Sequence, residues 1–268
     1  MTVIGNKFAG WRALGRVALF LVVCPIVLAV TSALTNKIPG VWRTFALGAV
    51  ASLCTFALTL LFVRREKLRL EEVGAAPRPA SLRRFALGFV GGLILVALVN
   101  FPAFVAGHVR WVAASPDIAA AAMMSITFIA LSCREELGFH GYPLRQLARV
   151  VGLWSSQLVI ALAFAIEHWM GGMPWTRALV GPVAGSLLFG MAAIATRGLA
   201  VPVGLHAAWN FGDWMLGWKE WPGMWEAVVA QGQEQRVELA RTISYLAVFG
   251  VATLAFWIWH RRKSGSNT

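Results

Sequence analysis

Long apolar stretches separated by short polar joins make up most of this chain. Five clear stretches have roughly the 20 apolar residues that a helix needs to cross the hydrocarbon core of a bilayer, and they lie at about 13–34, 42–63, 84–107, 199–217 and 242–260. Three weaker stretches, interrupted by polar residues, lie at about 117–147, 153–170 and 178–195. Glycine and proline mark the joins. The pattern predicts an all-α polytopic membrane helix bundle with about eight transmembrane helices, as a single membrane domain over residues 1–268.

The composition supports a membrane protein and argues against nucleic-acid binding. Of the 268 residues, 58% are hydrophobic and 13% are charged, whereas soluble domains have about half and about a quarter, respectively. The net charge is +12, but the basic residues flank the apolar stretches and form no basic stripe of the kind that binds nucleic acid. We therefore expect contacts with the lipid bilayer and no nucleic-acid partner. The three cysteines lie in apolar stretches without metal or redox spacing, so we expect no disulfide.

The lysines and arginines also predict the orientation of the bundle. Cytoplasmic segments of membrane proteins carry an excess of basic residues. With the N-terminus in the cytoplasm and eight crossings, 16 of the 24 lysines and arginines fall on the inner side and 7 on the outer side, while Arg134 lies within the fourth span. The joining segment 64–84, "RREKLRLEEVGAAPRPASLRR", is the strongest inner marker. We expect both termini on the cytoplasmic side.

Ionisable residues within the predicted spans are few. Such residues face the bundle interior or a wet cavity, because exposing them to lipid is costly. The acidic residues and histidines among them are Glu135, Glu136, Glu167, Asp213, His140, His168 and His206. At a rise of about 1.5 Å per residue, those of the fourth, fifth and seventh spans fall in a broad layer between the cytoplasmic side and the midplane. We expect a buried, water-accessible site in this layer.

Spacing along the helices divides the roles of these residues. His206 and Asn210 share one helix face, and so do Glu136 and His140, because each pair is four residues apart. Glu135 is rotated by about 100° from its neighbour. Adjacent carboxylates repel each other, and Arg134 and His140 are available to offset one of them. We therefore predict that one glutamate is a chemical base and the other is structurally paired.

A third glutamate, Glu167, lies beside His168 and has no assigned role in this division. It lies toward the outer end of its span. We expect it to pair with tryptophan or backbone groups at that end, or with Arg177.

Three short motifs resemble those of a known family. They are "EELGFHG" at 135–141, "FAIEH" at 164–168 and "HAAWN" at 206–210. The family is the CPBP group, the CAAX protease and bacteriocin-processing (Abi) proteins, whose motifs are two glutamates followed three residues later by arginine, then Phe-x-x-x-His, then His-x-x-x-Asn. Order, spacing and placement on separate spans all agree over about residues 115–215, the motif-bearing core.

The resemblance implies an intramembrane endopeptidase that uses a glutamate-activated water. It implies Glu135 as the general base, His168 as its partner, and His206 with Asn210 as stabilisers of the oxyanion, while Glu136 orients the site. Phe164 supports the second motif. The implied partner is a peptide or protein substrate at the membrane, of CAAX type in the family's namesake members, and the implied location is the cytoplasmic membrane. No cofactor and no metal are expected.

One position departs from the family pattern, because His140 stands where the family has arginine. A histidine braces a carboxylate through single hydrogen bonds and with pH dependence, whereas arginine is always charged and forks across both oxygens. Catalytic activity therefore depends on how well His140 braces Glu136. The sequence does not fix the substrate or the oligomeric state.

Three alternatives remain open on the sequence alone. The substitution at His140 motivates a catalytically weak or inactive member of the same fold that acts as a scaffold, immunity or regulatory protein. Glu135, His168 and His206 form a two-histidine, one-carboxylate set that suits a metal-dependent peptidase or metal transporter, although no His-Glu-x-x-His motif is present. Glutamate and histidine within spans also serve as proton relays in transporters.

Overall fold

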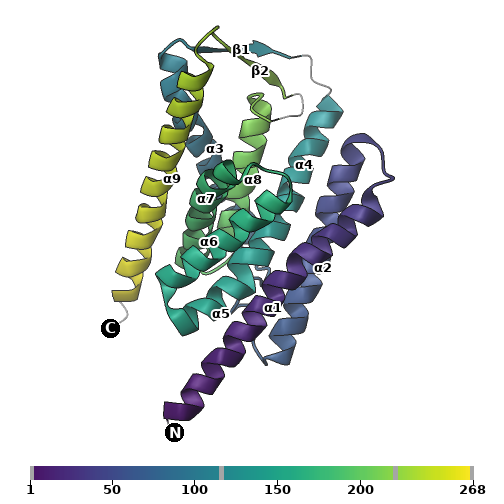
Figure 1. The fold of residues 1–268 in the computed structure, drawn as a ribbon, viewed down its shortest axis with the longest axis vertical. Helices are drawn as coiled ribbons and strands as arrows, with labels where there is room; N and C mark the ends of the chain where they lie inside the picture. The colour runs from purple at the N-terminus through teal and green to yellow at the C-terminus, as the bar shows by residue number, and fades with distance from the viewer. Residues whose placement is uncertain (1–2, 115–117, 220–222, 266–268) are drawn as a thin grey trace.

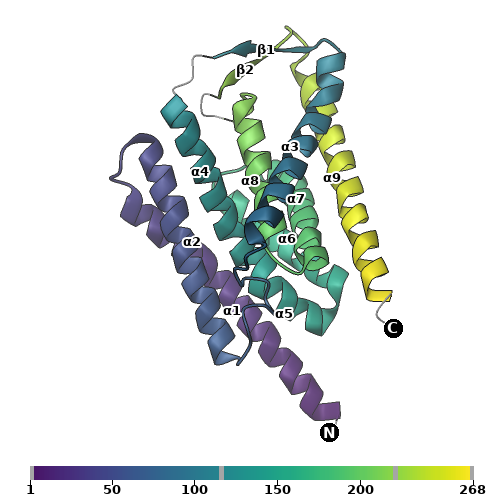
Figure 2. The same cartoon turned by 180° about the vertical axis from the view of Figure 1, so that it is seen from behind.

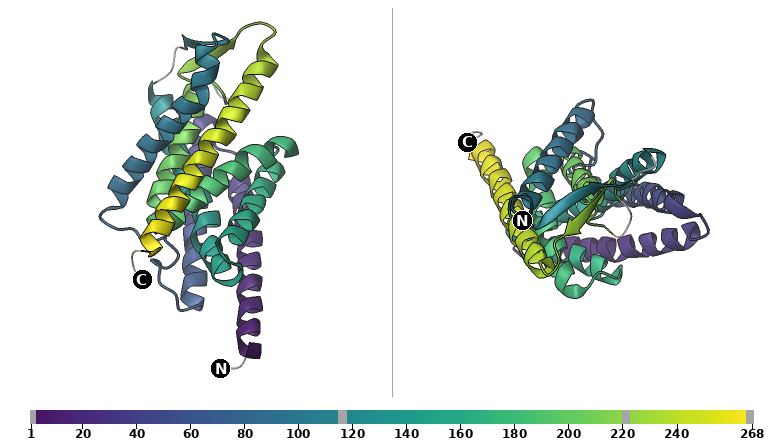
Figure 3. Two further views of the ribbon diagram at one scale, coloured as in Figure 1. Left: turned by 90° about the vertical axis from the view of Figure 1, so that its left-hand side faces the viewer. Right: turned by 90° about the horizontal axis from the view of Figure 1, so that it is seen from above.

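The computed structural model describes residues 3–114, 118–219 and 223–265, which form the helix bundle of Figure 1. A two-stranded sheet caps one end, while both described chain ends point to the other end (Figures 1 and 3). The elements in chain order are α1 (Val3–Thr35), α2 (Gly40–Arg65), α3 (Ser81–Val105), β1 (Val109–Ala113), α4 (Ile118–Glu135), a π-helical turn (Glu136–Gly141), α5 (Tyr142–Val151), α6 (Leu153–Met170), α7 (Trp175–Thr196), α8 (Ala200–Met215), β2 (Trp225–Val229) and α9 (Glu234–Gly265).

Five helices in the described part of the chain are long and apolar enough to cross a membrane. They are Gly10–Thr35, Gly40–Arg65, Ser81–Val105, Trp175–Thr196 and Glu234–Gly265. Their outward faces carry exposed apolar side chains such as Leu53 and Val251, as expected where lipid replaces water as the solvent. The predicted fold class, an all-α membrane helix bundle, is confirmed, and the chain is a multi-pass membrane protein. The number of crossings, eight, stays a prediction, because α4, α6 and α8 are shorter or more polar.

Small residues bring α3 and α8 close together at the centre of the bundle (Figure 2). A Cβ atom added at Gly204 of α8 would lie 2.2 Å from the carbonyl oxygen of Phe85 on α3, and one added at Gly92 would lie 2.6 Å from Ala208. In lipid, where apolar burial drives little association, close backbone approach is what holds two helices together. α2 packs mainly on α4, while α6 packs on α7 and α7 on α9.

The sheet was not predicted from the sequence. β1 pairs with β2 in antiparallel register, with Arg110 opposite Val228 and Val112 opposite Glu226. It joins the end of α3 to the segment before α9 and covers the end of the bundle away from the termini (Figures 1 and 2). Each strand has five residues, and neither shows the alternation of polar and apolar residues that marks a strand.

The predicted fourth span is broken at the motif. α4 ends at Glu135, the next six residues form a π-helical turn, and α5 then runs from Tyr142 to Val151. A π-helical turn widens the helix and often occurs at functional sites. Here it contains Glu136 and His140, and both side chains are fully buried.

Candidate active site

The carboxylate of Glu136 is the centre of a hydrogen-bonded cluster. His140 Nδ1 donates to Glu136 Oε2 at 2.8 Å, and His206 Nδ1 donates to Glu136 Oε1 at 3.0 Å. Both oxygens therefore have a partner, which a fully buried carboxylate requires. The contact between Glu136 and His140 follows from their predicted common helix face, which the π-helical turn preserves. The contact with His206 joins the first motif to the third.

The His206 ring lies between the two glutamates. Its Nε2 is 3.4 Å from Glu135 Oε2, on the opposite side of the ring from Glu136. The ring also stacks on Phe189, with centroids 4.4 Å apart and planes inclined by 15°. The Nδ1 contact with Glu136 is a hydrogen bond, whereas the longer Nε2 contact with Glu135 is not. The two carboxylates thus diverge as predicted, yet they meet the same ring from two sides.

Glu135 is less enclosed than its neighbour. Its side chain is 18% exposed, whereas that of Glu136 is 0% exposed. The Oε2 atom of Glu135 is buried and has no hydrogen-bond partner among the described residues. The two adjacent carboxylates therefore differ in environment. Glu136 has a donor on each of its oxygens, whereas Oε2 of Glu135 accepts no hydrogen bond from the described residues.

A buried serine completes the contacts of His140. Ser186 of α7 lies with its Oγ 2.9 Å from His140 Nε2, and its side chain is fully buried. With Nδ1 donating to Glu136, Nε2 of the neutral ring accepts from the serine hydroxyl. The chain Ser186–His140–Glu136 thus links α7 to the π-helical turn. No motif marks Ser186, so sequence reasoning missed it.

A cavity of about 710 Å³ reaches the histidines of the second and third motifs. Phe164, His168, His206 and Asn210 all line it. His168 Nδ1 donates to the carbonyl oxygen of Phe164 at 2.9 Å, so in the neutral ring Nε2 is the free acceptor. The lining residues come from α3, α6, α7, α8, β2 and α9 and from the segments that follow α6 and α8. Neither glutamate of the first motif lines it; His206 contacts both from the cavity wall.

Charged residues also line this cavity. Lys219 Nζ donates to Asn210 Oδ1 at 3.1 Å, which leaves the amide Nδ2 of Asn210 as a donor. Asp213, the acidic residue predicted near the outer end of its span, forms an ion pair with Arg241 of α9 at 2.8 Å. The Arg241 guanidinium also lies 3.8 Å from the ring centroid of Trp218. Charged groups of both signs therefore line the cavity.

Comparison with protein families identifies this region. Residues 117–212 match the family model of type II CAAX prenyl endopeptidases, Rce1-like. The match includes all three motifs and confirms the recognition made from them. It supports a CAAX-type intramembrane endopeptidase fold, and the matched family suggests a membrane protease. No curated protein and no solved structure shows significant similarity to the chain.

The third glutamate of the Rce1-like region has a different partner from the expected one. Glu167 of α6 forms a two-pronged ion pair with Arg134 of α4, through both guanidinium nitrogens and both carboxylate oxygens. The expectation of a pair with Arg177 was wrong, because Arg177 pairs with Glu238 at 3.0 Å. Arg134 is nearly fully buried. It therefore neutralises Glu167 and is not the brace of Glu136.

Two further observations bear on chemistry in the Rce1-like region. Among the described residues, no group of three histidine, cysteine, aspartate or glutamate side chains is arranged to hold a metal ion. Gln157 of α6 is buried, and its amide oxygen and nitrogen have no partner among those residues. A Cβ atom at Gly190 would lie 2.4 Å from that oxygen and 3.0 Å from His140 Cδ2. Gly190 therefore leaves the space in which the His140 ring sits.

Proposed function

We propose that this protein is a glutamate-dependent intramembrane endopeptidase in which Glu135 activates water. The observation that carries the proposal is the contrast between two adjacent carboxylates. Glu136 has both oxygens occupied by imidazole donors, whereas Glu135 has a free buried oxygen. A carboxylate oxygen that accepts no hydrogen bond is available to take a proton from a water molecule.

The proposed reaction is addition of water to a peptide carbonyl followed by loss of the amine. Glu135 takes a proton as the water oxygen bonds to the carbonyl carbon, and His168 Nε2 offers a second acceptor for that water. The negative charge on the former carbonyl oxygen is stabilised by donors at the cavity wall, which are the Asn210 amide and the Nε2–H of a His206 ring protonated on both nitrogens. Removing one such donor lowers rates by about 10²–10³-fold in other hydrolases. The proton then passes to the leaving nitrogen as the C–N bond breaks.

His140 performs the bracing role by a different means from the family arginine. It contacts Glu136 through one nitrogen and Ser186 through the other. Two linked single bonds hold the carboxylate where a guanidinium would fork across it. This arrangement supports an active site with His140 in place. The rival hypothesis, an inactive scaffold, is tested by the mapping of peptide termini described below.

The substrate is proposed to approach from the sheet end of the bundle. The cavity that reaches His168 and His206 is also lined by Val229 of β2 and Glu234 at the start of α9, which lie at that end. The basic residues predict that this end is the outer one, because most of them lie at the opposite end. We therefore propose location in the cytoplasmic membrane with substrates presented at its outer half.

Labelling of single cysteines tests the direction of approach. In a background without the three native cysteines, Thr176→Cys on the cavity wall should react with an impermeant maleimide in intact cells. Ser81→Cys, at the opposite end, should react only after the cells are permeabilised. The reverse pattern would contradict the proposed orientation without affecting the assignment as a protease.

Mapping of new peptide termini in membranes tests the catalytic proposal. Wild type, Glu135→Gln and His140→Arg are compared at matched expression, and folding is checked by thermal unfolding. Termini present in wild type should vanish in Glu135→Gln. A rise in His140→Arg would show that the histidine lowers the rate. If the three folded proteins give the same termini, the scaffold hypothesis replaces the protease.

A further inference from the structure

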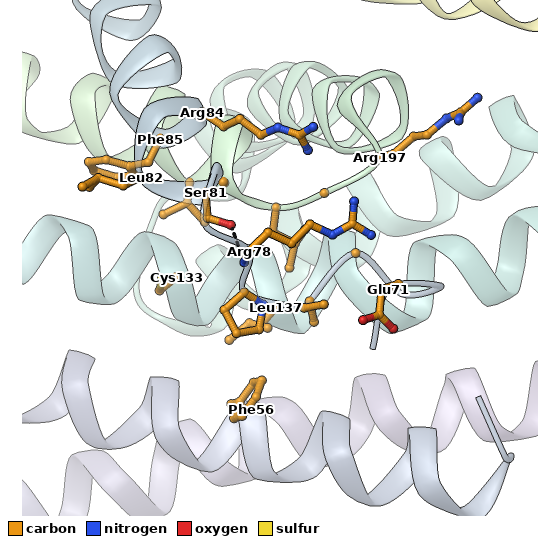
Figure 4. A pocket seen from close by; sticks show the side chains of 18 residues that line it. Phe56, Glu71, Arg78, Ser81, Leu82, Arg84, Phe85, Cys133, Leu137 and Arg197 are labelled. Atoms are coloured by element: carbon orange, nitrogen blue, oxygen red, sulfur yellow. Dashed lines mark hydrogen bonds between the residues drawn. The ribbon is translucent and has the colours of Figure 1, made fainter. Parts of the chain in front are cut away.

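A second cavity lies at the end of the bundle away from the sheet, and the proposed reaction does not use it. It has a volume of about 460 Å³ and lies between α2, α3, α4 and the start of α8. Arg78, Arg84 and Arg197 line it together with Glu71 (Figure 4). We call it the arginine pocket. Its side chains come from five separate segments, so the fold and not one local run of charge creates it.

The arginines of this pocket have little internal compensation. Within the described part of the chain none of the three forms an ion pair, and Arg84 makes only a long contact, 3.4 Å, to the carbonyl oxygen of Thr196. By contrast, five other described arginines, among them Arg134, Arg149 and Arg241, are paired with carboxylates within 3.3 Å. Three guanidinium groups and one carboxylate leave the pocket positive. Such a group of arginines suits a phosphate, whose oxygens match the guanidinium fork.

The inner part of the same pocket is apolar. Phe56, Phe85, Leu137, Leu199 and Val203 line it. Phe56 lies nine residues before Arg65, the last residue of α2, so the apolar part extends roughly 13 Å below that basic end at the α-helical rise. A soluble phosphate needs only the charged rim. A ligand that uses both parts carries a phosphate joined to a hydrocarbon chain.

The pocket is also held in shape and borders the bilayer. Leu199 N donates to the carbonyl oxygen of Gly74 at 3.1 Å, which ties the loop after α2 to the start of α8. Arg197 has a left-handed backbone, φ 53°, which costs energy for a residue with a side chain. α2 packs mainly on α4 and α3 packs mainly on α8, so the two helices on either side of the pocket are not each other's main partners. Leu82, which lines the pocket, is 77% exposed. A lipid can therefore enter from the side.

We propose that the arginine pocket is a binding site for an anionic phospholipid of the inner leaflet. The arginines hold the phosphate, and an acyl chain lies along the apolar wall. This wall includes Cys133 and Leu137, which flank the two glutamates of the first motif. A bound lipid therefore packs against the helical segment that carries Glu135 and Glu136 and stabilises it.

Lipid titration of the purified full-length protein tests this proposal. Phosphatidylglycerol is added to phosphatidylcholine mixed micelles, and bound lipid is counted by native mass spectrometry while the melting temperature is recorded. The pocket variant is R78Q/R84Q/R197Q. The matched control is R12Q/R65Q/R83Q, which removes the same charge from exposed positions at the same end. Melting without phosphatidylglycerol checks that both variants fold.

Wild type and the control variant should bind phosphatidylglycerol saturably, with one tightly held molecule and a rise in melting temperature. In the pocket variant, half-saturation should need about 100-fold more lipid, because each of the three arginines near an anionic headgroup contributes about fivefold. Equal losses in both variants would show diffuse attraction and overturn the site. The same stabilisation by inorganic phosphate or by glycerophosphoglycerol, which lacks acyl chains, would also overturn it in favour of a soluble ligand. Because binding is the readout, the result is independent of proteolysis.

Discussion

We expect the stability of the site to depend on Glu136, because this carboxylate accepts a hydrogen bond on each of its two oxygens. The carboxylate is fully buried and bonded to His140 and His206. Glu136→Ala leaves two imidazole donors buried without a partner. Removal of one member of a buried charged network costs about 3–5 kcal/mol in the free energy of unfolding. We expect Glu136→Ala to destabilise the protein by that amount.

Glu136→Gln should cost less, because His140 can change its tautomer. The glutamine offers one oxygen to His206 and one amide N–H to His140 Nδ1. The ring proton of His140 then moves to Nε2, which donates to Ser186 Oγ at the observed 2.9 Å. Two charge-assisted hydrogen bonds become neutral ones, a loss of about 1–2 kcal/mol.

This switch makes Ser186 more important in the glutamine variant. With Glu136 present, Ser186→Ala removes a hydroxyl that donates to the ring, at a cost of about 0.5–1.5 kcal/mol. With glutamine present, it leaves a buried N–H without an acceptor, at about 1–3 kcal/mol. The double variant should therefore be less stable than the sum of the single changes by about 1 kcal/mol.

Unfolding with increasing SDS in mixed micelles, followed by tryptophan fluorescence, measures these free energies. Ser125→Ala is the matched control, because Ser125 Oγ donates only to the carbonyl of Ala121 on its own helix. That change should give the same cost with Glu136 or glutamine. A loss below about 1 kcal/mol in Glu136→Ala, or strict additivity of Glu136→Gln with Ser186→Ala, would refute the proposed hydrogen-bond network.

Three other changes test neighbouring features. Arg134→Gln should lower the free energy of thermal unfolding by about 3–5 kcal/mol, because it leaves Glu167 buried without its partner. Leucine at both positions should restore stability to within about 1 kcal/mol of wild type. Equal losses of stability in the single and the double variant would contradict a buried ion pair. Gly204→Ala should cost about 3 kcal/mol, because its Cβ would lie 2.2 Å from a backbone oxygen, while Gly181→Ala, with open space around it, should not destabilise. The backbone N–H of Arg69 donates to the Glu72 carboxylate and holds its pKa below the ordinary value of 4.5. This loop contact is therefore fully formed above pH 4.5 and is lost as the pH falls through the lowered pKa. Amide exchange of the loop should accelerate on acidification, and Glu72→Gln should abolish this pH dependence.

The helices were predictable because lipid imposes a simple length and hydrophobicity requirement. The predicted stretch 13–34 lies within α1, and 153–170 has the bounds of α6. α9 begins at Glu234, eight residues before the predicted stretch, since its first turns are polar and lie at the sheet end. Hydropathy finds the apolar part of a helix and misses a polar extension.

Contacts within one helix were predictable, but contacts between helices were not. The four-residue spacing of Glu136 and His140 gives their contact directly. The pair of Arg134 with Glu167 joins residues 33 positions apart, and it depends on how α4 and α6 are rotated and shifted along their axes. Ser186 reaches His140 for the same reason. Hydropathy and short motifs carry no information about helix rotation, so these partners became visible only in the structure.

The contacts around the site suggest why a histidine is tolerated where the family has arginine. The buried cluster contains Glu135 and Glu136, and a third glutamate, Glu167, precedes His168 in α6. Arg134 neutralises Glu167 and fixes α4 against α6. The next residue after each member of this pair, Glu135 and His168, is a predicted catalytic residue. His206 faces both remaining carboxylates. A hydrogen-bond donor for Glu136 thus comes from α8, and the residue at position 140 has only to orient the other carboxylate oxygen, which an imidazole held by Ser186 can do.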